Sequence, residues 1–389
     1  MSADSPLRIG VIMNGVTGRM GTNQHLRRSI LSIRRDGGME IPGIGRILPE
    51  PVLVGRNPVK LERLSRETGV ETWTDRLDRA LEDPANRIYF DAQTTPLRAA
   101  AMERALEAGR HVYCEKPAAA TSAEAHRLYR MAQGRGLKHG VVQDKLWVPG
   151  IVRLKRLLRD GSLGRILSVR GEFGYWVFDG RDAPLQRPSW NYRREEGGSI
   201  ILDMFPHWRY LLENLFGRVR AVSCLGATHV RRRWNEKGRE YAVTADDSAY
   251  ATFLLDGDVV AHFNSSWAVR VRRDDLFTLQ VDGTLGSAVC GLNHCWVQLA
   301  RSTPRVTWNP DLEQSHAWLE SWSPAPGPAP ASGPFRTQWE LFLRHVLADE
   351  PFPWNMLEGA KGVQLAECAR ESWLSRSWVD IPVLSPDSG

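Results

Sequence analysis

The chain has 389 residues, of which 42% are hydrophobic and 25% charged, a balance that excludes global disorder and fits a globular protein of about two domains. No stretch approaches the roughly 20 apolar residues of a membrane-spanning helix, and the 51 basic and 45 acidic residues are spread too evenly to indicate a nucleic-acid partner. The few residues before the first expected strand leave no room for the apolar core of a signal peptide, so we expect a cytoplasmic protein with no membrane partner.

Strand and helix patterns alternate over residues 1–145. Alternation of this kind predicts βαβ units and a parallel sheet. Residues 37–49 are rich in Gly and Pro and longer than a usual connection, which indicates an insertion before the second strand. The expected strands are 7–13, 51–56, 88–92, 110–114 and 138–142, and the expected helices are 19–34, 58–68, 96–108 and 122–134.

After residue 145 long strands replace the alternation. Asp-Gly pairs at 256–257 and 282–283 supply tight turns between neighbouring strands, which predicts a large, mostly antiparallel open sheet. We therefore expect a second, α+β domain over residues 146–389. Its expected strands are 164–176, 219–230, 247–256, 258–271, 275–282 and 286–300; its expected helices are 149–159, 198–216 and, after a Pro/Ala/Gly loop at 323–334, the C-terminal pair 335–348 and 356–375.

The five cysteines are too few and too scattered for a disulfide framework. Cys290, His294 and Cys295 lie close together and raise the possibility of a metal site. No second cluster completes a tetrahedral set, so the sequence predicts thiols and no metal.

The first strand runs into a glycine-rich turn, Asn14-Gly15-Val16-Thr17-Gly18-Arg19-Met20-Gly21, and a helix follows it. Glycines let the backbone approach a pyrophosphate and present helix N–H groups to its charge. With a strand before it and a helix after it, this turn predicts a dinucleotide-binding Rossmann domain over residues 1–145. The expected cofactor contacts in the turn are Asn14, Gly15, Thr17, Gly18, Arg19 and Met20.

The end of the second strand bears on which dinucleotide binds. An NAD site usually has an acidic residue here that bonds the ribose 2′-hydroxyl, whereas this chain has Arg56 and Asn57. A cation can pair with a 2′-phosphate, which favours NADP(H), although an arginine stacked on the adenine would still allow NAD. Further cofactor contacts are expected at the strand ends from Arg56, Asn57, Thr94, Thr95, Glu115 and Lys116.

Two motifs carry candidate catalytic groups. Glu115-Lys116-Pro117 follows a parallel strand whose carboxyl end borders the ligand crevice, and a lysine there can hydrogen-bond a substrate hydroxyl. In the segment from Gly197 to His207, Asp203 and His207 are four residues apart, so on a helix they share one side. An imidazole beside a carboxylate suits a general base. A lysine that closes a turn and an ion pair within a helix are the structural alternatives.

With these two motifs behind a dinucleotide fold, the chain resembles the Gfo/Idh/MocA oxidoreductases, relatives of glucose–fructose oxidoreductase and inositol dehydrogenase. The resemblance implies that His207 takes a hydroxyl proton, Lys116 bonds the reacting oxygen and Asp203 orients, while a hydride passes to nicotinamide. It also implies a sugar, cyclitol or derivative as substrate, and a homodimer or homotetramer built through the open sheet. Met13 replaces the first glycine common in the family, and Gln143-Asp144-Lys145 replaces an arginine-containing sequence.

Tryptophan is abundant, at 15 residues, and its flat faces suit the apolar side of a sugar ring. Five tryptophans lie in or near segments expected to line the crevice, with a core position as the alternative for about half of them: Trp147, Trp176, Trp190, Trp208 and Trp267. The segment from Arg187 to Arg193 closely precedes the Gly197 turn and is the best candidate for a substrate loop. Arg187, Arg193 and Lys145 could hold an anionic group on the sugar. The expected substrate contacts are Lys145, Trp147, Tyr175, Arg187, Trp190, Asn191, Tyr192 and Arg193.

Three functions remain open from the sequence. The first is a nicotinamide-dependent oxidoreductase that acts on a hydroxyl carbon of a sugar, sugar derivative or cyclitol. The second is an NAD-dependent glycosidase that oxidises C3, eliminates the C1 substituent, adds water and returns the hydride, with Tyr192, Tyr175 or a water as extra acid or base. The third is a nucleotide-sensing regulator, which the presence of Lys116, Asp203 and His207 disfavours.

Overall fold

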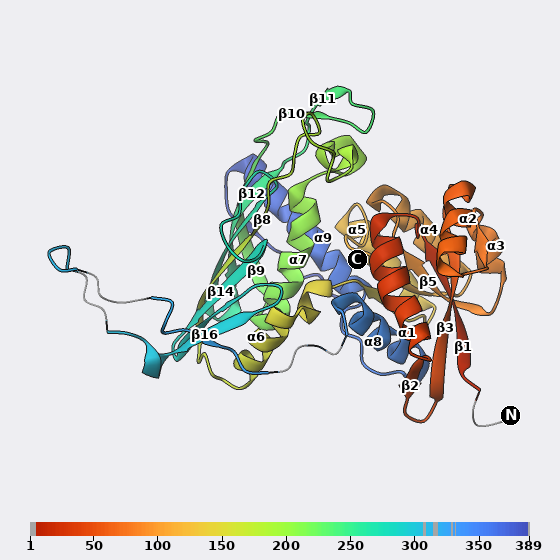
Figure 1. Cartoon of the computed structure of the whole chain (residues 1–389), viewed down its shortest axis with the longest axis horizontal. Helices are drawn as coiled ribbons and strands as arrows, with labels where there is room; N and C mark the ends of the chain where they lie inside the picture. The colour runs from red at the N-terminus through yellow and green to blue at the C-terminus, as the bar shows by residue number, and fades with distance from the viewer. Residues whose placement is uncertain (1–4, 306–308, 314–317, 328–329, 331, 388–389) are drawn as a thin grey trace.

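The computed structural model describes residues 5–305, 309–313, 318–327, 330 and 332–387, and it contains two large sheets with helices between them (Figure 1). In the N-terminal sheet the strand order is β2-β3-β1-β5-β6-β7, with β4 paired to β3. In the C-terminal sheet the order is β17-β16-β15-β14-β8-β13-β12-β9-β18. The expected division into a parallel and a mostly antiparallel sheet is confirmed.

The N-terminal sheet is parallel except for β2, and its apolar residues face helices on both sides. Burial on both faces explains why its strands read as nearly continuous apolar runs. The strands are β1 (Leu7–Asn14), β2 (Met39–Ile41), β3 (Gly45–Val54), β4 (Trp73–Thr74), β5 (Asn86–Asp91), β6 (His111–Cys114) and β7 (His139–Val141). The helices are η1 (Met20–Ile30), which continues into α1 (Leu31–Arg35), then α2 (Pro58–Thr68), α3 (Leu77–Glu82), α4 (Thr95–Glu107) and α5 (Ser122–Gly134).

The expected insertion at 37–49 is a β-hairpin that belongs to this sheet. β2 pairs with the first residues of β3, so the second parallel strand begins at Gly45 and not at residue 51 as expected. Pro49 and Pro51, which made this stretch look irregular, lie where β3 has no neighbour on its outer side, between the residues paired to β2 and those paired to β4. A proline has no N–H to donate, so an unpaired edge position tolerates it.

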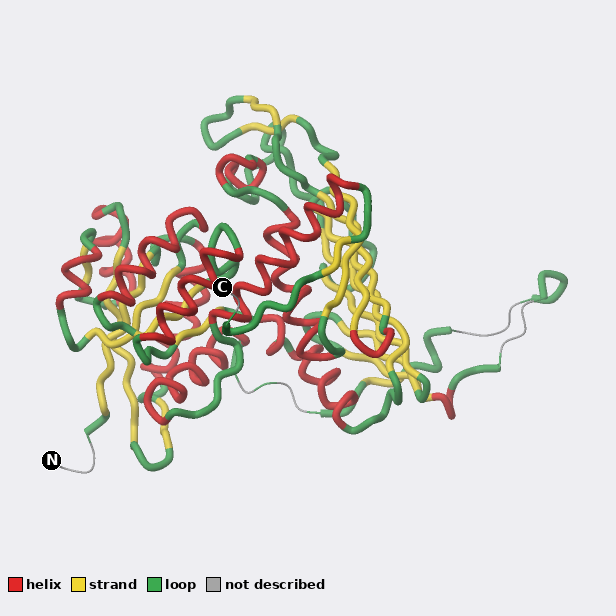
Figure 2. Tube along the Cα trace, turned by 180° about the vertical axis from the view of Figure 1, so that it is seen from behind, coloured by secondary structure: helices red, strands yellow, loops and turns green. Residues whose placement is uncertain are grey.

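The C-terminal sheet has antiparallel neighbours except for the parallel pair β8 and β13. Figure 2 shows that its helices cover the face toward the N-terminal domain and leave the other face bare. Its strands are β8 (Ile166–Gly174), β9 (Val219–Ala227), β12 (Ser248–Leu255), β13 (Val260–Ser266), β14 (Phe277–Gly283), β15 (Gly286–Cys290), β16 (Cys295–Leu299), β17 (Ser323–Pro324) and β18 (Val379–Asp380). The longer helices of this part are α6 (Pro149–Arg159), α7 (Ile200–Leu215), α8 (Pro334–Ala348) and α9 (Met356–Ser375).

Some expectations for this half were wrong in detail. The stretch 286–300 is two strands, β15 and β16, because a tight turn closed by the Gly291 N–H and the His294 carbonyl (2.9 Å) separates them. The expected strand 258–271 ends at Ser266. Part of the expected loop at 323–334 lies outside the described residues. Short elements that were not expected are η2 (Asp144–Trp147), η3 (Ser189–Tyr192), η4 (Arg194–Glu196), η5 (Asp256–Asp258), η6 (Ala300–Ser302) and the hairpin β10 (Arg232–Trp234) with β11 (Glu240–Ala242).

Helix α8 packs into the core of the N-terminal domain although it follows the C-terminal sheet in the chain. Trp339 is fully buried there, with ring centroids 5.1 Å from Phe90 and 4.9 Å from Tyr113. The domain limits 1–145 and 146–389 stay a prediction. Helix α8 and the start of α9, with Met356, Leu357 and Ala360, pack into the cores of the N-terminal part. None of the helices among the described residues is long and apolar enough to cross a membrane.

Replacing Trp339 by alanine should lower the free energy of unfolding by about 3–5 kcal/mol, because it opens a cavity in the N-terminal core. Urea denaturation measures the change. Trp378→Ala is the matched control, since Trp378 is 49% exposed. Equal effects of the two substitutions would contradict the assignment of α8 to this core.

Candidate active site

A buried hydrogen-bond network holds together the loops at the carboxyl ends of β1, β5 and β6. The Asn14 amide donates to the Tyr89 hydroxyl (2.8 Å), which donates to an Asp91 carboxylate oxygen (2.6 Å). Arg98 donates to the other Asp91 oxygen (3.1 Å) and to the carbonyl of Pro117. The glycine-rich turn and the Lys116 segment are therefore linked to one another by hydrogen bonds within the protein.

The glycine-rich turn has the close backbone packing that a pyrophosphate cradle needs. Gly15 has φ +75°, and a Cβ there would lie 2.7 Å from backbone atoms of Ala92 and Gln93. A Cβ at Gly21 would lie 2.8 Å from the Gly15 carbonyl oxygen, so the helix start also needs glycine to pack this closely. Gly18 and Arg19 are exposed beside it. These features fit a bound dinucleotide.

The other expected cofactor contacts are placed as follows. Arg56 and Asn57 are exposed at the end of β3, where the Asn57 side chain caps α2 by accepting a hydrogen bond from the Lys60 N–H (3.0 Å). Thr94 is exposed just before α4, whereas Thr95 is buried. Thr17 and Met20 are half-buried, and Asn14 is already bonded to Tyr89. Their contacts with a cofactor stay a prediction.

Glu115 is buried and positions the backbone of its neighbour. One of its carboxylate oxygens is 2.8 Å from His25 Nε2, and the other accepts the Lys116 N–H (3.1 Å). Trp339 donates to His25 Nδ1 (3.0 Å), and because an indole N–H only donates, the proton of His25 lies on Nε2. Burial tends to raise the pKa of Glu115, but the His25 hydrogen bond and the charge of Lys116 lower it.

The carboxylate of Asp203 lies between two cations. Lys116 Nζ donates to one oxygen (2.6 Å) and to the Asp203 carbonyl (3.0 Å), while Arg187 donates to the other oxygen (3.2 Å). Arg187 also donates to the hydroxyl of Tyr175 (2.9 Å) and to the side chain of Asn191 (3.3 Å). Burial tends to raise the pKa of Asp203, but the charges of Lys116 and Arg187 hold it well below the ordinary carboxyl value.

His207 is buried one helical turn after Asp203. Burial lowers its pKa well below 6.5, and the charges of Lys116 and Lys145 lower it further, against the opposite effect of Asp144 and Asp203. The imidazole is therefore neutral near pH 7 and can accept a proton.

Two residues of this cluster were missed from the sequence, Asp144 and Tyr210. The Tyr210 hydroxyl lies 2.6 Å from His207 Nδ1 and 3.2 Å from one oxygen of Asp144, whose other oxygen pairs with Lys145 Nζ (2.5 Å). Tyr210 follows His207 by three residues on the same helix, and Asp144 lies in the segment that departs from the family pattern. The helical spacing of Tyr210 and the unusual segment around Asp144 could therefore have drawn attention to both residues, but neither observation indicated a chemical role.

The structure thus joins Lys116, Asp203 and His207 with Lys145, Tyr175, Arg187 and Asn191. The remaining expected substrate contacts have other neighbours. Trp147 packs edge-on against Trp354, at 4.9 Å between ring centroids. Tyr192 is buried between Trp267 and the guanidinium of Arg233, Arg193 pairs with Glu196 and stacks on Tyr241, and Trp190 is half-buried. Their roles toward a substrate stay a prediction.

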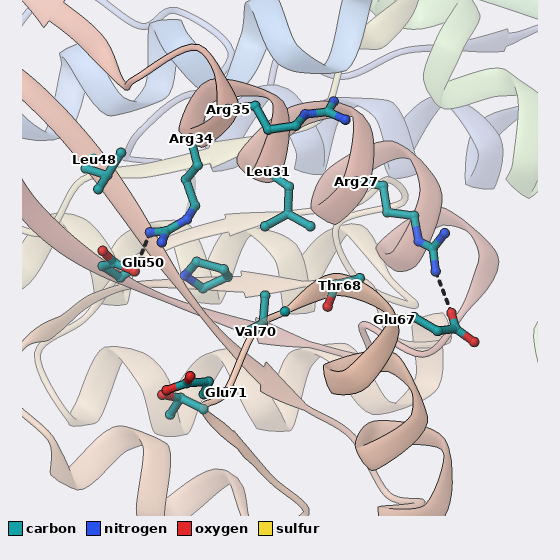
Figure 3. Close-up of a pocket in the computed structure, with 13 residues that line it drawn as sticks. Arg27, Leu31, Arg34, Arg35, Leu48, Glu50, Glu67, Thr68, Val70 and Glu71 are labelled. Carbon is teal, nitrogen blue, oxygen red and sulfur yellow. Dashed lines mark hydrogen bonds and ion pairs between the residues drawn. The ribbon is translucent and has the colours of Figure 1, made fainter.

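A groove of about 730 Å³ lies elsewhere, between η1, α1, β3 and the turn after α2 (Figure 3). Ion pairs flank it, Arg34 with Glu50 and Arg27 with Glu67. It contains none of the residues of the cluster around Asp203.

Comparison with known proteins matches both halves of the chain. Residues 38–143 match a family model described as an oxidoreductase family with an NAD-binding Rossmann fold, and residues 151–289 match a GFO/IDH/MocA C-terminal domain. A D-xylose dehydrogenase of Paenarthrobacter nicotinovorans is 48% identical over 381 residues, 97% of this chain and 98% of the relative. The chain belongs to the Gfo/Idh/MocA oxidoreductase family.

More distant proteins agree with this membership. Levoglucosan dehydrogenase of Pseudarthrobacter phenanthrenivorans is 24% identical over 361 residues, 86% of this chain and 90% of the relative. The structure of a levoglucosan dehydrogenase with NADH and L-sorbose has a TM-score of 0.80 at 23% identity and covers 97% of this chain and 99% of that chain. The expected fold and the expected nicotinamide-dependent oxidoreductase are thereby confirmed.

Asp203→Asn should lower the free energy of unfolding at pH 7 by up to about 3 kcal/mol, because it leaves two cations without their carboxylate. The pKa of Asp203 is depressed in the folded state, so its contribution is complete above the unfolded carboxyl pKa of about 3.9 and is lost as the pH falls below it. The difference in the free energy of unfolding between wild type and variant, measured by urea denaturation at several pH values, should therefore decrease as the pH falls.

Asp182→Asn is the control for this experiment, since the side chain of Asp182 is 91% exposed and should show no comparable gap. A gap for Asp203→Asn that stayed constant with pH would contradict the charge arrangement described here.

Proposed function

We propose that this oxidoreductase oxidises a neutral aldose of the D-xylose type at a hydroxyl carbon, with Lys116, Asp203 and His207 as its catalytic residues. The observation that carries the substrate is the 48% identity with a D-xylose dehydrogenase over nearly the whole of both chains. The cluster around Asp203 supports the residue roles, because a base, a cation and a carboxylate meet beside the glycine-rich turn.

The residues divide the proton chemistry between them. Neutral His207 accepts the proton of the substrate hydroxyl, and the Lys116 ammonium stabilises the negative charge that develops on that oxygen. Asp203 bonds Lys116 through both its side chain and its carbonyl, so the ammonium is held in one place. A bound nicotinamide dinucleotide supplies the hydride acceptor, and the backbone of Gly15 to Gly18 and the start of η1 would hold its pyrophosphate.

The charge pairing favours a neutral sugar over an anionic one. Each cation that was a candidate for an anionic group has a carboxylate partner: Arg187 pairs with Asp203, Lys145 with Asp144, and Arg193 with Glu196. An anion on the substrate would have to displace one of these partners. A sugar that offers only hydroxyls needs no such exchange.

The glycosidase alternative finds less support in these residues. It needs an additional acid or base, and burial raises the pKa of Tyr192 to about 12, which keeps this phenol from acting as a base near neutrality. The hydroxyl of Tyr175 already accepts a hydrogen bond from Arg187.

NADP(H) is the preferred cofactor in this proposal. Arg56 is exposed at the end of β3 where an NAD site usually has an acid, and the exposed Arg19 follows the glycine-rich turn.

We also propose a homo-oligomer built through the bare face of the C-terminal sheet, where Leu225 and Trp296 are 59% and 42% exposed. A cytoplasmic location stays an expectation.

The reaction is tested with purified protein, NAD or NADP, D-xylose, other aldoses and a chromogenic xyloside. We expect stoichiometric cofactor reduction with the free sugar and no aglycone release. Lys116→Ala and His207→Ala should each lower kcat/KM by about 100-fold or more while the Kd of the dinucleotide changes little. Aglycone release without net cofactor reduction would instead establish the glycosidase.

Lys237→Ala and His294→Ala serve as controls for these substitutions, because both side chains are exposed and outside the cluster. If His207→Ala kept near-full activity, the base assignment would be wrong.

The cofactor preference is tested with Arg56→Ala. We expect the KM for NADP to rise about tenfold, since one charge-assisted contact to the 2′-phosphate is lost, while the KM for NAD changes little. Arg63→Ala on α2 is the matched control, since the side chain of Arg63 is 73% exposed. Equal changes for both dinucleotides would contradict a role of Arg56 in selecting the phosphate.

A further inference from the structure

The hydroxyl of Tyr210 lies at the centre of a buried group of three partners. It is 2.6 Å from His207 Nδ1, 3.1 Å from the backbone nitrogen of Lys145 and 3.2 Å from an oxygen of Asp144. Tyr210, Asp144 and His207 are each at most 6% exposed. At these distances all three contacts are hydrogen bonds, and together they use the full capacity of one hydroxyl group.

The direction of each bond follows from what each partner can do. A hydroxyl has one proton and two lone pairs, and the Lys145 backbone N–H, which only donates, occupies one lone pair. The pKa of Asp144 is well below the ordinary carboxyl value despite burial, because of the charge and the hydrogen bond of Lys145, so its carboxylate only accepts. The proton of Tyr210 therefore points to Asp144, and the remaining lone pair faces His207 Nδ1.

From this arrangement we propose that Tyr210 and Asp144 are positioning residues that fix His207 with its proton on Nδ1. The lone pair of Nε2, which has no partner among the described residues, is then the one that takes the substrate proton. The inference rests on the proposed role of His207 as the base and explains why its Nε2 is unprotonated and able to accept the substrate proton.

No other neighbour can replace Tyr210 in this task. The nearest Asp144 oxygen is 3.7 Å from His207 Nδ1, too far for a hydrogen bond, so the carboxylate acts only through the tyrosine. Lys116 and Lys145 present cations to the imidazole, and a cation cannot accept a proton from Nδ1. The carboxylate of Asp203 is engaged by Lys116 and Arg187.

Asp144→Asn tests the proposal by reversing the chain of hydrogen bonds. Lys145 Nζ bonds the second oxygen of Asp144 and needs an acceptor there, so the single amide oxygen of the variant would face Lys145. The amide NH₂ would then face Tyr210 and donate to it. The tyrosine proton must turn to His207 Nδ1, which forces the imidazole proton onto Nε2.

The tautomer is read directly from ¹⁵N chemical shifts of the full chain labelled at histidine, without substrate, near pH 7. His207→Gln identifies the signals of His207 among the 10 histidines. We expect Nδ1–H in the wild type, Nε2–H in Asp144→Asn, and a mixture in Tyr210→Phe. Among the residues that the structure describes, the hydroxyl of the buried Tyr129 forms a hydrogen bond only with Gln133 of α5, so Tyr129→Phe should keep the wild-type tautomer.

The kinetic readout separates positioning from folding. We expect Asp144→Asn to lower kcat by about 100-fold or more, as a wrong tautomer does at a catalytic imidazole, while the KM for the sugar and the Kd of the dinucleotide change little. The decrease in kcat should be smaller for Tyr210→Phe, because part of the His207 population in this variant keeps the productive tautomer. Tyr129→Phe should retain wild-type kcat.

An Nε2–H wild type, or an Asp144→Asn variant that keeps Nδ1–H, would overturn the proposal whatever the activity. If the tautomers follow expectation but the wild type oxidises no sugar, the proposed function fails and the hydrogen-bond assignment stands. A kcat of Asp144→Asn within about twofold of wild type, with the tautomer inverted, would overturn the catalytic importance of the assignment.

Discussion

One carboxylate carries an ion pair to each half of this enzyme. Asp203, on α7, is bonded by Lys116 from the N-terminal half and by Arg187 from the C-terminal half. A largely buried charge without partners is costly, so both cations must be in place when the chain folds. Because Lys116 is also held at its backbone by Glu115, the pairing fixes the Lys116 segment against α7.

The fold was largely predictable because its main signals are local. Parallel strands buried on both faces appear as apolar runs, and the Asp-Gly turns separate antiparallel strands. The split of 286–300 into two strands comes from a local turn, whereas two other departures depend on contacts between segments that are not adjacent in sequence. Pro49 and Pro51 fit in β3 because neither β2 nor β4 pairs with these two positions. Helix α8 packs into the N-terminal core because Trp339 contacts Phe90 and Tyr113 there.

The sequence predicted part of the candidate site and missed two of its residues. Asp203 and His207 follow from helical spacing, and Lys116 from its place at a strand end. Asp144 and Tyr210 could not be paired from the sequence, because 66 residues separate them and their contact depends on how η2 packs against α7. Among the tryptophans considered for sugar stacking, Trp208 and Trp267 are fully buried, since amphipathic pattern alone does not distinguish a core indole from one that lines a crevice.

The position of α8 has a consequence for how the protein is made. The dinucleotide-binding domain lacks part of its own core until residues 334–348 have left the ribosome, although its strands are complete by residue 141. During most of translation the aromatic side chains of Phe90 and Tyr113, and the imidazole that holds Glu115, have no cover from this helix. The domain synthesised first therefore completes its core only after most of the C-terminal sheet has been synthesised.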